Sequence, residues 1–304
     1  MKLVTYESRA KRLFGAVLDG RIVDLSPVLP APNESLGVPV DALERGGTGM
    51  MAFLAAGAPA MDAARAYLAE VQRHWHSEAY PALRDTRLLA PVPRPGKVVA
   101  IGRNYADHAA ETGVKPFERP RIIAKLPSSV VGPGAVVERP EDVTKLDYEV
   151  ELGVVIGKRT KRAPRSQALE SVAGYTILDD VSAREFQFDV APAQTTFAKS
   201  MDGFCPMGPW LVTRDEISDP QDLALKLWVN DELLQDGNTH DMIFDVARLI
   251  EYISRFMTLE PGDVIATGTP AGVGAFRTPP RWLQPGDRLR LEIARIGVLE
   301  HSIA

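Results

Sequence analysis

The chain has 304 residues, of which 45% are hydrophobic and 25% charged, with 24 glycines and 24 prolines. This composition is typical of a globular protein that is long enough to bury a sizeable core, and it predicts one large domain or two unequal ones. The formal net charge is −5, with acidic and basic residues interspersed. That pattern argues against a nucleic acid or an anionic membrane as the main partner, but it allows a small anionic substrate in a local basic pocket.

The number of cysteines and the length of the hydrophobic runs indicate the cellular compartment and exclude some kinds of metal site. Cys205 is the one cysteine, which excludes an intrachain disulfide and a zinc site built from cysteines. The first nine residues contain no long apolar run and no cleavage pattern, and no run in the chain reaches membrane-spanning length. We therefore expect a cytoplasmic protein that does not associate with a membrane.

Residues 1–90 predict a small α+β unit. Apolar patterns indicate strands over residues 2–6, 13–18 and 21–25, helices over residues 41–45 and 50–56, and a longer helix over residues 61–75. A proline-rich connector covers residues 88–96. We place the boundary there, between a small N-terminal domain (1–90) and a larger domain (91–304).

A short helix with a paired histidine follows a predicted strand over residues 97–101. Asp107 can begin this helix and Gly113 can end it. His108 and Glu111 are three residues apart and share a helical face. A carboxylate that contacts an imidazole raises its basicity and orients it, which is how a general base is prepared. The alternative is an ordinary ion pair at the surface.

The segment from Leu146 to Gly157 predicts one continuous strand with two acidic residues in it. Residues two apart in a strand point to the same side, so Glu149 and Glu151 aim two carboxylates at one place. Two such charges repel each other unless a cation lies between them, and a divalent metal ion is the simplest one. The alternative is a solvated strand face with two exposed glutamates.

The remaining segments add candidate site residues. A strand over residues 173–178 runs into Asp179 and Asp180, which precede a helical turn over residues 181–187 and can face a pocket or cap that turn. Lys199 lies in a loop, and the glycine-rich loop over residues 268–274 offers backbone amides and Thr269 to an anion. Further strands over residues 210–213, 223–229, 264–267 and 289–293, with an amphipathic helix over residues 242–256, show no regular alternation of strand and helix. This order predicts a mixed α+β domain.

Five motifs together resemble the catalytic domain of the fumarylacetoacetate hydrolase family, over residues 95–304. They are Ile101-Gly102-Arg103-Asn104-Tyr105-Ala106-Asp107-His108, Asp147-Tyr148-Glu149-Val150-Glu151-Leu152-Gly153, Asp180-Val181-Ser182-Ala183-Arg184, Lys199-Ser200 and Gly268-Thr269-Pro270-Ala271-Gly272-Val273-Gly274. The resemblance implies an α+β fold with the mixed β-sheet roll of that domain. It also implies a homodimer, and it matches residues 1–90 to the small N-terminal domain of many bacterial members.

The resemblance also implies roles for individual residues. The implied metal ligands are Glu149, Glu151 and Asp180, with Mg²⁺ as the usual ion and Mn²⁺ or Ca²⁺ as substitutes. Three carboxylates without sulfur or clustered imidazole suit such a hard cation. The implied catalytic residues are His108 and Glu111, an acid/base pair on a lid, and Lys199 beside the metal. The positions implied to orient substrate oxygens are Arg103, Lys125, Gln187 and Thr269.

One position departs from the family's pattern, because Ile101 stands where the eponymous hydrolase has a further aspartate ligand. This departure places the chain in the shorter branch that is related to acylpyruvases and 2-hydroxyhepta-2,4-diene-1,7-dioate isomerases. We expect a metal-dependent hydrolase that cleaves a carbon–carbon bond in a 2,4-dioxo acid through a pyruvate enolate, with the Lys199 ammonium stabilising the oxyanion at C4.

Two alternatives remain open on the sequence. The same enolate chemistry serves a decarboxylase, isomerase or hydratase of a 2-oxo or 2-hydroxydienoate diacid in aromatic catabolism, including oxaloacetate decarboxylation. A folded binding domain with structural carboxylates would not be an enzyme at all.

Overall fold

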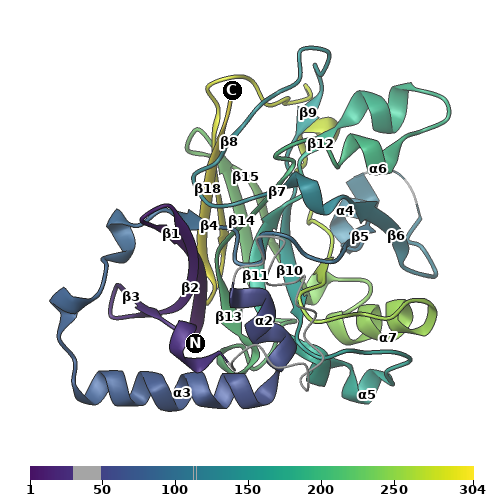
Figure 1. The fold of residues 1–304 in the computed structure, drawn as a ribbon. Helices are drawn as coiled ribbons and strands as arrows, with labels where there is room; N and C mark the ends of the chain where they lie inside the picture. Colours follow the sequence, from purple (N-terminus) through teal and green to yellow (C-terminus); the bar gives the residue numbers. More distant parts are fainter. Residues whose placement is uncertain (30–48, 112, 114) are drawn as a thin grey trace.

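The computed structural model describes residues 1–29, 49–111, 113 and 115–304 (Figure 1). The helix predicted over residues 41–45 lies outside these ranges. Two large sheets, a two-stranded ladder and a set of helices make up the described part of the chain. The position of the candidate site follows from how the two sheets are ordered.

The larger sheet is mixed and runs through the middle of the molecule (Figure 1). Its long strands carry β-branched and aliphatic residues that alternate between its two faces. Its order is β3 (Arg21–Asp24), β2 (Lys11–Leu18), β1 (Lys2–Ser8), β13 (Cys205–Thr213), β11 (Val172–Asp179), β10 (Val150–Ile156), β16 (Val264–Ala266), β5 (Val98–Gly102) and β6 (Arg121–Lys125), with β4 (Leu88–Leu89) paired to β1 and β7 (Val130–Val131) paired to β13.

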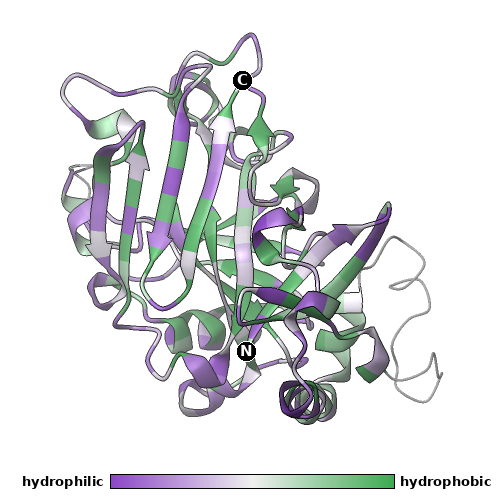
Figure 2. Cartoon of the chain, turned by 90° about the vertical axis from the view of Figure 1, so that its left-hand side faces the viewer, coloured by the Kyte–Doolittle hydropathy of each residue, from purple (hydrophilic) through white to green (hydrophobic). Residues whose placement is uncertain are grey.

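A second sheet has five strands in the order β15 (Glu232–Asn238), β14 (Ala224–Val229), β17 (Arg288–Ile293), β18 (Gly297–Ile303) and β8 (Val136–Val137). Buried and more exposed residues alternate along β14, β17 and β18. Figure 2 shows this alternation as bands of hydrophobic and hydrophilic colour along the strands. The inner face therefore packs on the core while the outer face meets solvent. A two-stranded ladder joins β9 (Leu146–Asp147) to β12 (Ser182–Ala183).

Helices cover the sheets at their sides. They are α2 (Gly49–Ala56), α3 (Ala58–Arg73), α4 (Ala106–Glu111), α5 (Arg165–Ala168), α6 (Thr195–Ala198) and α7 (Val246–Phe256). Asp245 caps α7, because its side chain accepts a hydrogen bond from the backbone N–H of Arg248. The predicted helices over residues 61–75 and 242–256 correspond to α3 and α7.

The core divides over the two faces of β10. Val150, Leu152, Val154 and Ile156 belong to the cluster that includes the inner face of the five-stranded sheet and α7, whereas Val155 packs in the cluster that includes α2. Because Glu151 lies at an odd position like Val155, it points away from the first cluster. This arrangement frees one face of β10 for polar side chains.

The structure corrects two local predictions. The strand predicted over residues 146–157 is interrupted at Tyr148 and Glu149, which lie between β9 and β10. The strand is interrupted because a side chain takes the place of a backbone partner. The Asp179 carboxylate accepts the hydrogen bond from the backbone N–H of Glu149. The segment over residues 181–187 is strand β12 followed by a π-helical turn, Glu185–Asp189, and not one helical turn.

The strands of residues 1–90 are continuous with the larger sheet. Strand β1 pairs antiparallel with β13, with Lys2 opposite Val212 and Leu3 opposite Leu211. A hairpin turn at Asp19–Gly20 joins β2 to β3, and both residues have positive φ angles as a tight hairpin turn requires. The boundary at residue 90 stays a prediction.

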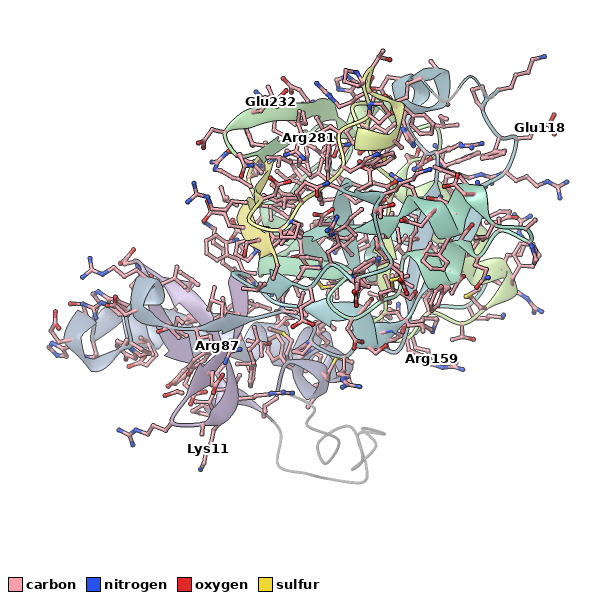
Figure 3. The ribbon with its side chains drawn as sticks, turned by 90° about the horizontal axis from the view of Figure 1, so that it is seen from above. Lys11, Arg87, Glu118, Arg159, Glu232 and Arg281 are labelled. Carbon is pink, nitrogen blue, oxygen red and sulfur yellow. The ribbon has the colours of Figure 1, made fainter. Side chains whose placement is uncertain are left out.

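Charges of both signs project from the surface, as the labelled Lys11, Arg87, Glu118 and Arg159 show in Figure 3. Across the described ranges, no helix has both the length and the apolar character that crossing a membrane requires.

Candidate active site

Three carboxylates converge where β10 and β11 pair. Glu151 lies on β10, Glu149 lies just before it, and Asp180 directly follows β11. Val150 on β10 lies opposite Asp179 at the end of β11. Glu149 and Glu151 flank Val150 in sequence, so both glutamates lie at this end of the strand pair. The backbone N–H of Asp180 donates to the carbonyl of Glu149 at 2.9 Å. One oxygen of each carboxylate lies within 4.8 Å of the others, so the expected convergence of two acids is confirmed and a third joins them.

Lys199 bridges two of these carboxylates. Its ammonium donates to Glu149 Oε2 at 2.8 Å, to Asp180 Oδ2 at 2.7 Å and to Ser182 Oγ at 2.8 Å. These three acceptors use all three donors of a lysine. The geometry therefore makes Lys199 a counter-charge within the site, and it leaves no donor for the predicted contact with a substrate oxyanion.

Lys125 lies deeper than predicted. Its ammonium donates to Asp180 Oδ1 at 2.6 Å and to the Phe204 carbonyl at 2.8 Å, and it also contacts the Lys199 carbonyl. Its side chain is fully buried and does not line the pocket. The structure thus places Lys125 behind Asp180, where it orients that carboxylate.

Arg184 links the site to a buried aspartate. Its guanidinium donates to Glu149 Oε1 at 2.6 Å and to Asp147 Oδ2 at 2.8 Å. Asp147 also accepts hydrogen bonds from the backbone N–H groups of Gly274, at 2.7 Å, and Ala275, at 3.0 Å. Asp147 thereby holds the end of the glycine-rich loop against the site.

The cations and acids shift each other's pKa. Burial alone would raise the pKa of Glu149, but the positive charges of Lys199 and Arg184 outweigh it and hold this pKa well below its usual range. Burial raises the pKa of Glu151 well above its usual range, and the charges of Asp180 and Glu149 raise it further. The two glutamates thus differ in environment although they lie two residues apart.

This donor set fits a hard divalent cation. Glu151 is 1% exposed, and among the described residues its carboxylate accepts a hydrogen bond from the backbone N–H of Gly268 at 2.8 Å. Four buried carboxyl groups (Asp147, Glu149, Glu151 and Asp180) outnumber the three cations that contact them (Lys125, Arg184 and Lys199), and this excess of acids favours a bound metal ion. Oxygen ligands of this kind suit Mg²⁺, Mn²⁺ or Ca²⁺.

His108 of the predicted acid/base pair lines the same pocket, and Glu111 contacts it. His108 Nδ1 lies 2.6 Å from Glu111 Oε1, and Glu111 Oε2 accepts from the backbone N–H of Gly272 at 3.0 Å. His108 is 6% exposed. Since Nδ1 faces the Glu111 carboxylate, Nε2 is the ring nitrogen that can exchange a proton with a ligand. His108 is therefore buried in the pocket that the carboxylates line, while Glu111 is partly exposed, so the two do not form an ordinary surface ion pair.

The pocket is small in this conformation, with a cavity volume of about 30 Å³. Of the positions predicted to orient substrate, Arg103, Gln187 and Thr269 line it. Gln187 is held by Arg184, and Thr269 accepts from the Gln235 amide at 2.7 Å.

Among the pocket residues that were not predicted as site residues, four have charged or aromatic side chains. They are Arg121, Arg184, Phe188 and Phe276. Arg184 closes one of the five sequence motifs, and that position could have signalled its role. Nothing in the local sequence distinguishes the other three, because their place in the site depends on strand pairing and on loop packing.

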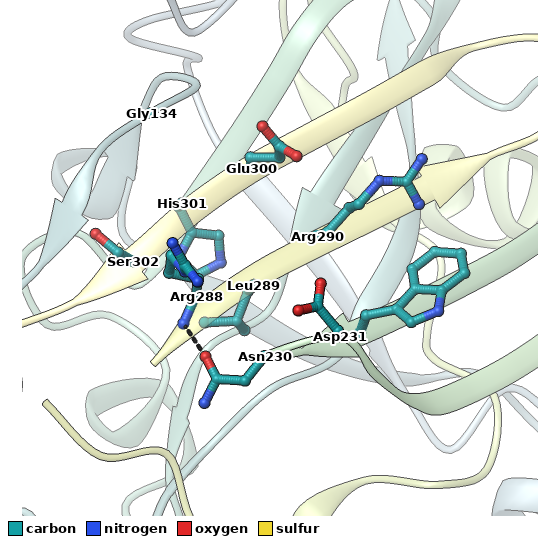
Figure 4. Close-up of a pocket in the computed structure, with 10 residues that line it drawn as sticks. Gly134, Asn230, Asp231, Arg288, Leu289, Arg290, Glu300, His301 and Ser302 are labelled. Atoms are coloured by element: carbon teal, nitrogen blue, oxygen red, sulfur yellow. Dashed lines mark hydrogen bonds between the residues drawn. The ribbon is translucent and has the colours of Figure 1, made fainter. Parts of the chain in front are cut away.

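A separate hollow of about 730 Å³ lies on the outer face of the five-stranded sheet (Figure 4). The backbone N–H of Arg288 donates to Asn230 Oδ1 at 2.9 Å at its edge, as the dashed line shows. None of the three converging carboxylates lines it. Its lining is Gly134, Trp228, Asn230, Asp231, Arg288, Leu289, Arg290, Glu300, His301 and Ser302.

Comparison with known proteins identifies the family. The model of the fumarylacetoacetate (FAA) hydrolase C-terminal domain matches residues 97–304. The chain belongs to the fumarylacetoacetate hydrolase family. This result confirms the family and the α+β fold that the sequence motifs predicted.

Curated relatives include mitochondrial oxaloacetate tautomerases. The chain is 46% identical to oxaloacetate tautomerase FAHD2A of Homo sapiens over 219 residues, which cover 72% of this chain and 70% of that protein. It is 40% identical to oxaloacetate tautomerase Fahd2a of Rattus norvegicus over 286 residues, which cover 94% and 85%. The family match and these relatives show that the chain is similar to enzymes.

Solved structures of the family superpose over the whole chain. The fumarylacetoacetate hydrolase of psychrophilic Exiguobacterium antarcticum has 36% identity and a TM-score of 0.78, covering 100% of this chain and 99% of that one. The maleylpyruvate hydrolase of Sphingobium sp. SYK-6, in complex with manganese(II) ion and pyruvate, has 29% identity and a TM-score of 0.79 with the same coverage. That complex and the acidic triad together support a divalent-metal site in this family fold.

Proposed function

We propose that the chain is a Mg²⁺-dependent enzyme that interconverts the keto and enol forms of a 2-oxo dicarboxylic acid of the oxaloacetate class. The observation that carries this proposal is that His108, which Glu111 contacts, lines one pocket with the three carboxylates. The similarity to oxaloacetate tautomerases supports the substrate class. It favours the diacid alternative of the sequence analysis over the acylpyruvate hydrolase.

Glu149, Glu151 and Asp180 would hold the metal ion. When bound, a divalent cation supplies Lewis-acid polarisation of the C2 carbonyl, which acidifies the protons on C3. Lys125 and Lys199 keep the Asp180 carboxylate oriented, and Arg184 does the same for Glu149.

Proton transfer falls to His108. Its Nε2 removes a proton from C3, the electron pair of that C–H bond forms the C2–C3 double bond, and the C2 oxygen takes up the released charge. The protonated imidazole then gives the same proton to the C2 oxygen, which completes the enol without net gain or loss of atoms. The Glu111 carboxylate, whose Oε1 lies 2.6 Å from Nδ1 of His108, holds the imidazole ring in place and stabilises its protonated form.

Hydrolysis of a 2,4-dioxo acid is the second candidate. It is favoured by the same base, which can deprotonate a water, and by the similarity to a maleylpyruvate hydrolase. Hydroxide would attack the C4 carbonyl, the C3–C4 bond would break, and C3 would be protonated to give pyruvate and a second acid. The occupied donors of Lys199 weigh against this route, since they leave no ammonium proton for the C4 oxyanion.

One experiment separates the candidates. Purified protein with Mg²⁺ is given enol oxaloacetate, and separately an acylpyruvate, while enol absorbance and pyruvate release are followed together. A tautomerase removes the enol signal of oxaloacetate without forming pyruvate, whereas a hydrolase removes the acylpyruvate signal with one pyruvate per turnover.

A variant pair tests the base in the same assay. His108→Asn should lose about 10²- to 10⁴-fold in rate, which is the usual contribution of a positioned acid–base group. The control His240→Asn changes a histidine whose side chain is 60% exposed and should keep the wild-type rate. A His108→Asn variant with wild-type rate in both assays would disprove the proposed role.

A further inference from the structure

Two arginines stand at one side of the metal pocket without an acidic partner. Arg103 follows β5 and Arg121 begins β6, and the pairing of these strands places Gly102 opposite Arg121. Both arginines line the pocket, and both are partly exposed. No ion pair or hydrogen bond of either guanidinium is found within the described ranges of the chain. Arg103 has one aromatic neighbour, because its guanidinium lies 5.7 Å from the centre of the Phe117 ring.

Strand geometry fixes how Arg121 relates to the metal ligands. Arg121, Ile123 and Lys125 share one face of β6, because they lie two residues apart. Lys125 reaches Asp180, as described above, and the Cα of Arg121 lies about 13 Å further along the strand. The face of one strand therefore runs from the metal-binding floor of the pocket to its rim.

The backbone at Arg103 is held in an unusual conformation. Its φ angle is +55°, which is uncommon for a residue other than glycine and costs energy. The next residue, Asn104, fixes it, since the Asn104 side chain donates to the carbonyls of Phe244 at 3.0 Å and Thr267 at 2.7 Å. The backbone conformation that these contacts fix holds Arg103 at the edge of the pocket, beside Arg121.

The charges of the pocket are separated along its length. Its acidic lining residues are Glu149, Glu151 and Asp180, which gather at the floor and belong to the metal site. The rim carries the two arginines, which repel each other, and partial burial together with Arg121 lowers the pKa of Arg103. A second anionic group on the ligand would relieve this repulsion and would be bound by charge-assisted hydrogen bonds.

We propose that Arg103 and Arg121 form a subsite for the distal carboxylate of a dicarboxylate substrate, whose other end chelates the metal. This inference rests on the proposed function and narrows it, because it makes Arg121 the residue that selects a 2-oxo diacid over a 2-oxo monoacid. The two guanidiniums bind the carboxylate that does not react, and the enolisation itself proceeds at the floor of the pocket.

The test uses oxaloacetate and its 4-amide, two ligands of the same shape that differ in the distal charge. The wild-type holoenzyme with Mg²⁺ should favour oxaloacetate in kcat/KM. In Arg121→Met this preference should fall by about 10- to 100-fold, the value of one or two charged hydrogen bonds, and the loss should appear in KM. Arg119→Met removes an exposed cation from the same segment and should keep the wild-type preference. Arg121→Lys should recover part of the preference, because it restores the charge without the planar fork.

Equal loss toward both ligands in Arg121→Met would overturn the subsite, and so would an unchanged preference. Calorimetric titration of both ligands in the presence of Mg²⁺ separates this outcome from a failure of the proposed function. If the wild-type protein binds oxaloacetate more tightly than the amide, and Arg121→Met does not, the subsite stands even where no tautomerase activity is found. If the wild-type protein binds both ligands equally, the subsite is wrong whatever reaction is catalysed.

Discussion

Replacing Lys199 with methionine removes one buried positive charge from between two buried carboxylates. The side chain is 3% exposed, and its ammonium lies 2.8 Å from Glu149 and 2.7 Å from Asp180. At an effective dielectric constant of about 20, each attraction amounts to roughly 6 kcal/mol. Desolvation of the ammonium cancels several kcal/mol of this gain. We therefore expect the free energy of unfolding of Lys199→Met to fall by about 3–5 kcal/mol in metal-free buffer, or about 6–10 °C in melting temperature.

A metal ion on the same carboxylates should compensate for the missing ammonium. Mg²⁺ should therefore stabilise Lys199→Met more than it stabilises the wild-type protein. Binding at 100 times the dissociation constant contributes about 2.7 kcal/mol, so the two proteins should melt closer together in Mg²⁺ than in chelator.

Thermal melts in chelator and in saturating Mg²⁺ measure both effects. Lys226→Met is the matched control, because Lys226 is 40% exposed and lies 3.7 Å from Asp236. Such a surface pair contributes less than about 1 kcal/mol. A Lys199→Met variant that melts together with the wild-type protein in chelator would refute the counter-charge role. So would an equal Mg²⁺ shift in both proteins.

Three further predictions concern the surroundings of the site. Glu111→Gln should lower kcat by about 10- to 100-fold in steady-state assays, because a neutral amide orients His108 but stabilises its charged form less; a rate equal to wild type would count against the pair. Burial raises the pKa of the Cys205 thiol to about 12. A thiol reagent at pH 8 should therefore label the folded protein very slowly, and it should label one thiol per chain after denaturation. Rapid labelling of the native protein would contradict this prediction. Asp179→Asn should weaken Mg²⁺ binding about 10-fold by titration calorimetry, since Asp179 fixes the backbone N–H of Glu149; unchanged affinity would show that this contact is dispensable.

Several parts of the site could be predicted from sequence because they depend on local periodicity. His108 and Glu111 share a face three residues apart on α4, and the structure pairs them at 2.6 Å. Glu149 and Glu151 converge as a spacing of two predicts, although the strand breaks at Glu149. The spacing sufficed here because both partners lie within a few residues of each other.

Other contacts depend on residues that are distant in sequence. Arg184 reaches Asp147 and Glu149 only because β12 pairs with β9, and nothing near position 184 announces that pairing. Lys125 was predicted to contact substrate, but the packing of β6 turns its ammonium toward Asp180. Single-residue chemistry cannot decide between these outcomes, because a lysine serves equally well as a ligand-binding group or as a buried counter-charge.

The amino-acid sequence by itself determined the family, the mixed α+β class and the chemistry of the metal-binding end, because carboxylates at short spacings and a histidine–glutamate pair carry their geometry with them. Only the tertiary structure decided how the charges balance and which donors are free. Three cations approach the carboxylates from three different segments. Lys199 and Arg184 lower the pKa of Glu149, whereas burial and the neighbouring acids raise the pKa of Glu151. Burial and long-range ion pairing arise from packing of the whole chain, and they leave no signature in a local stretch of sequence.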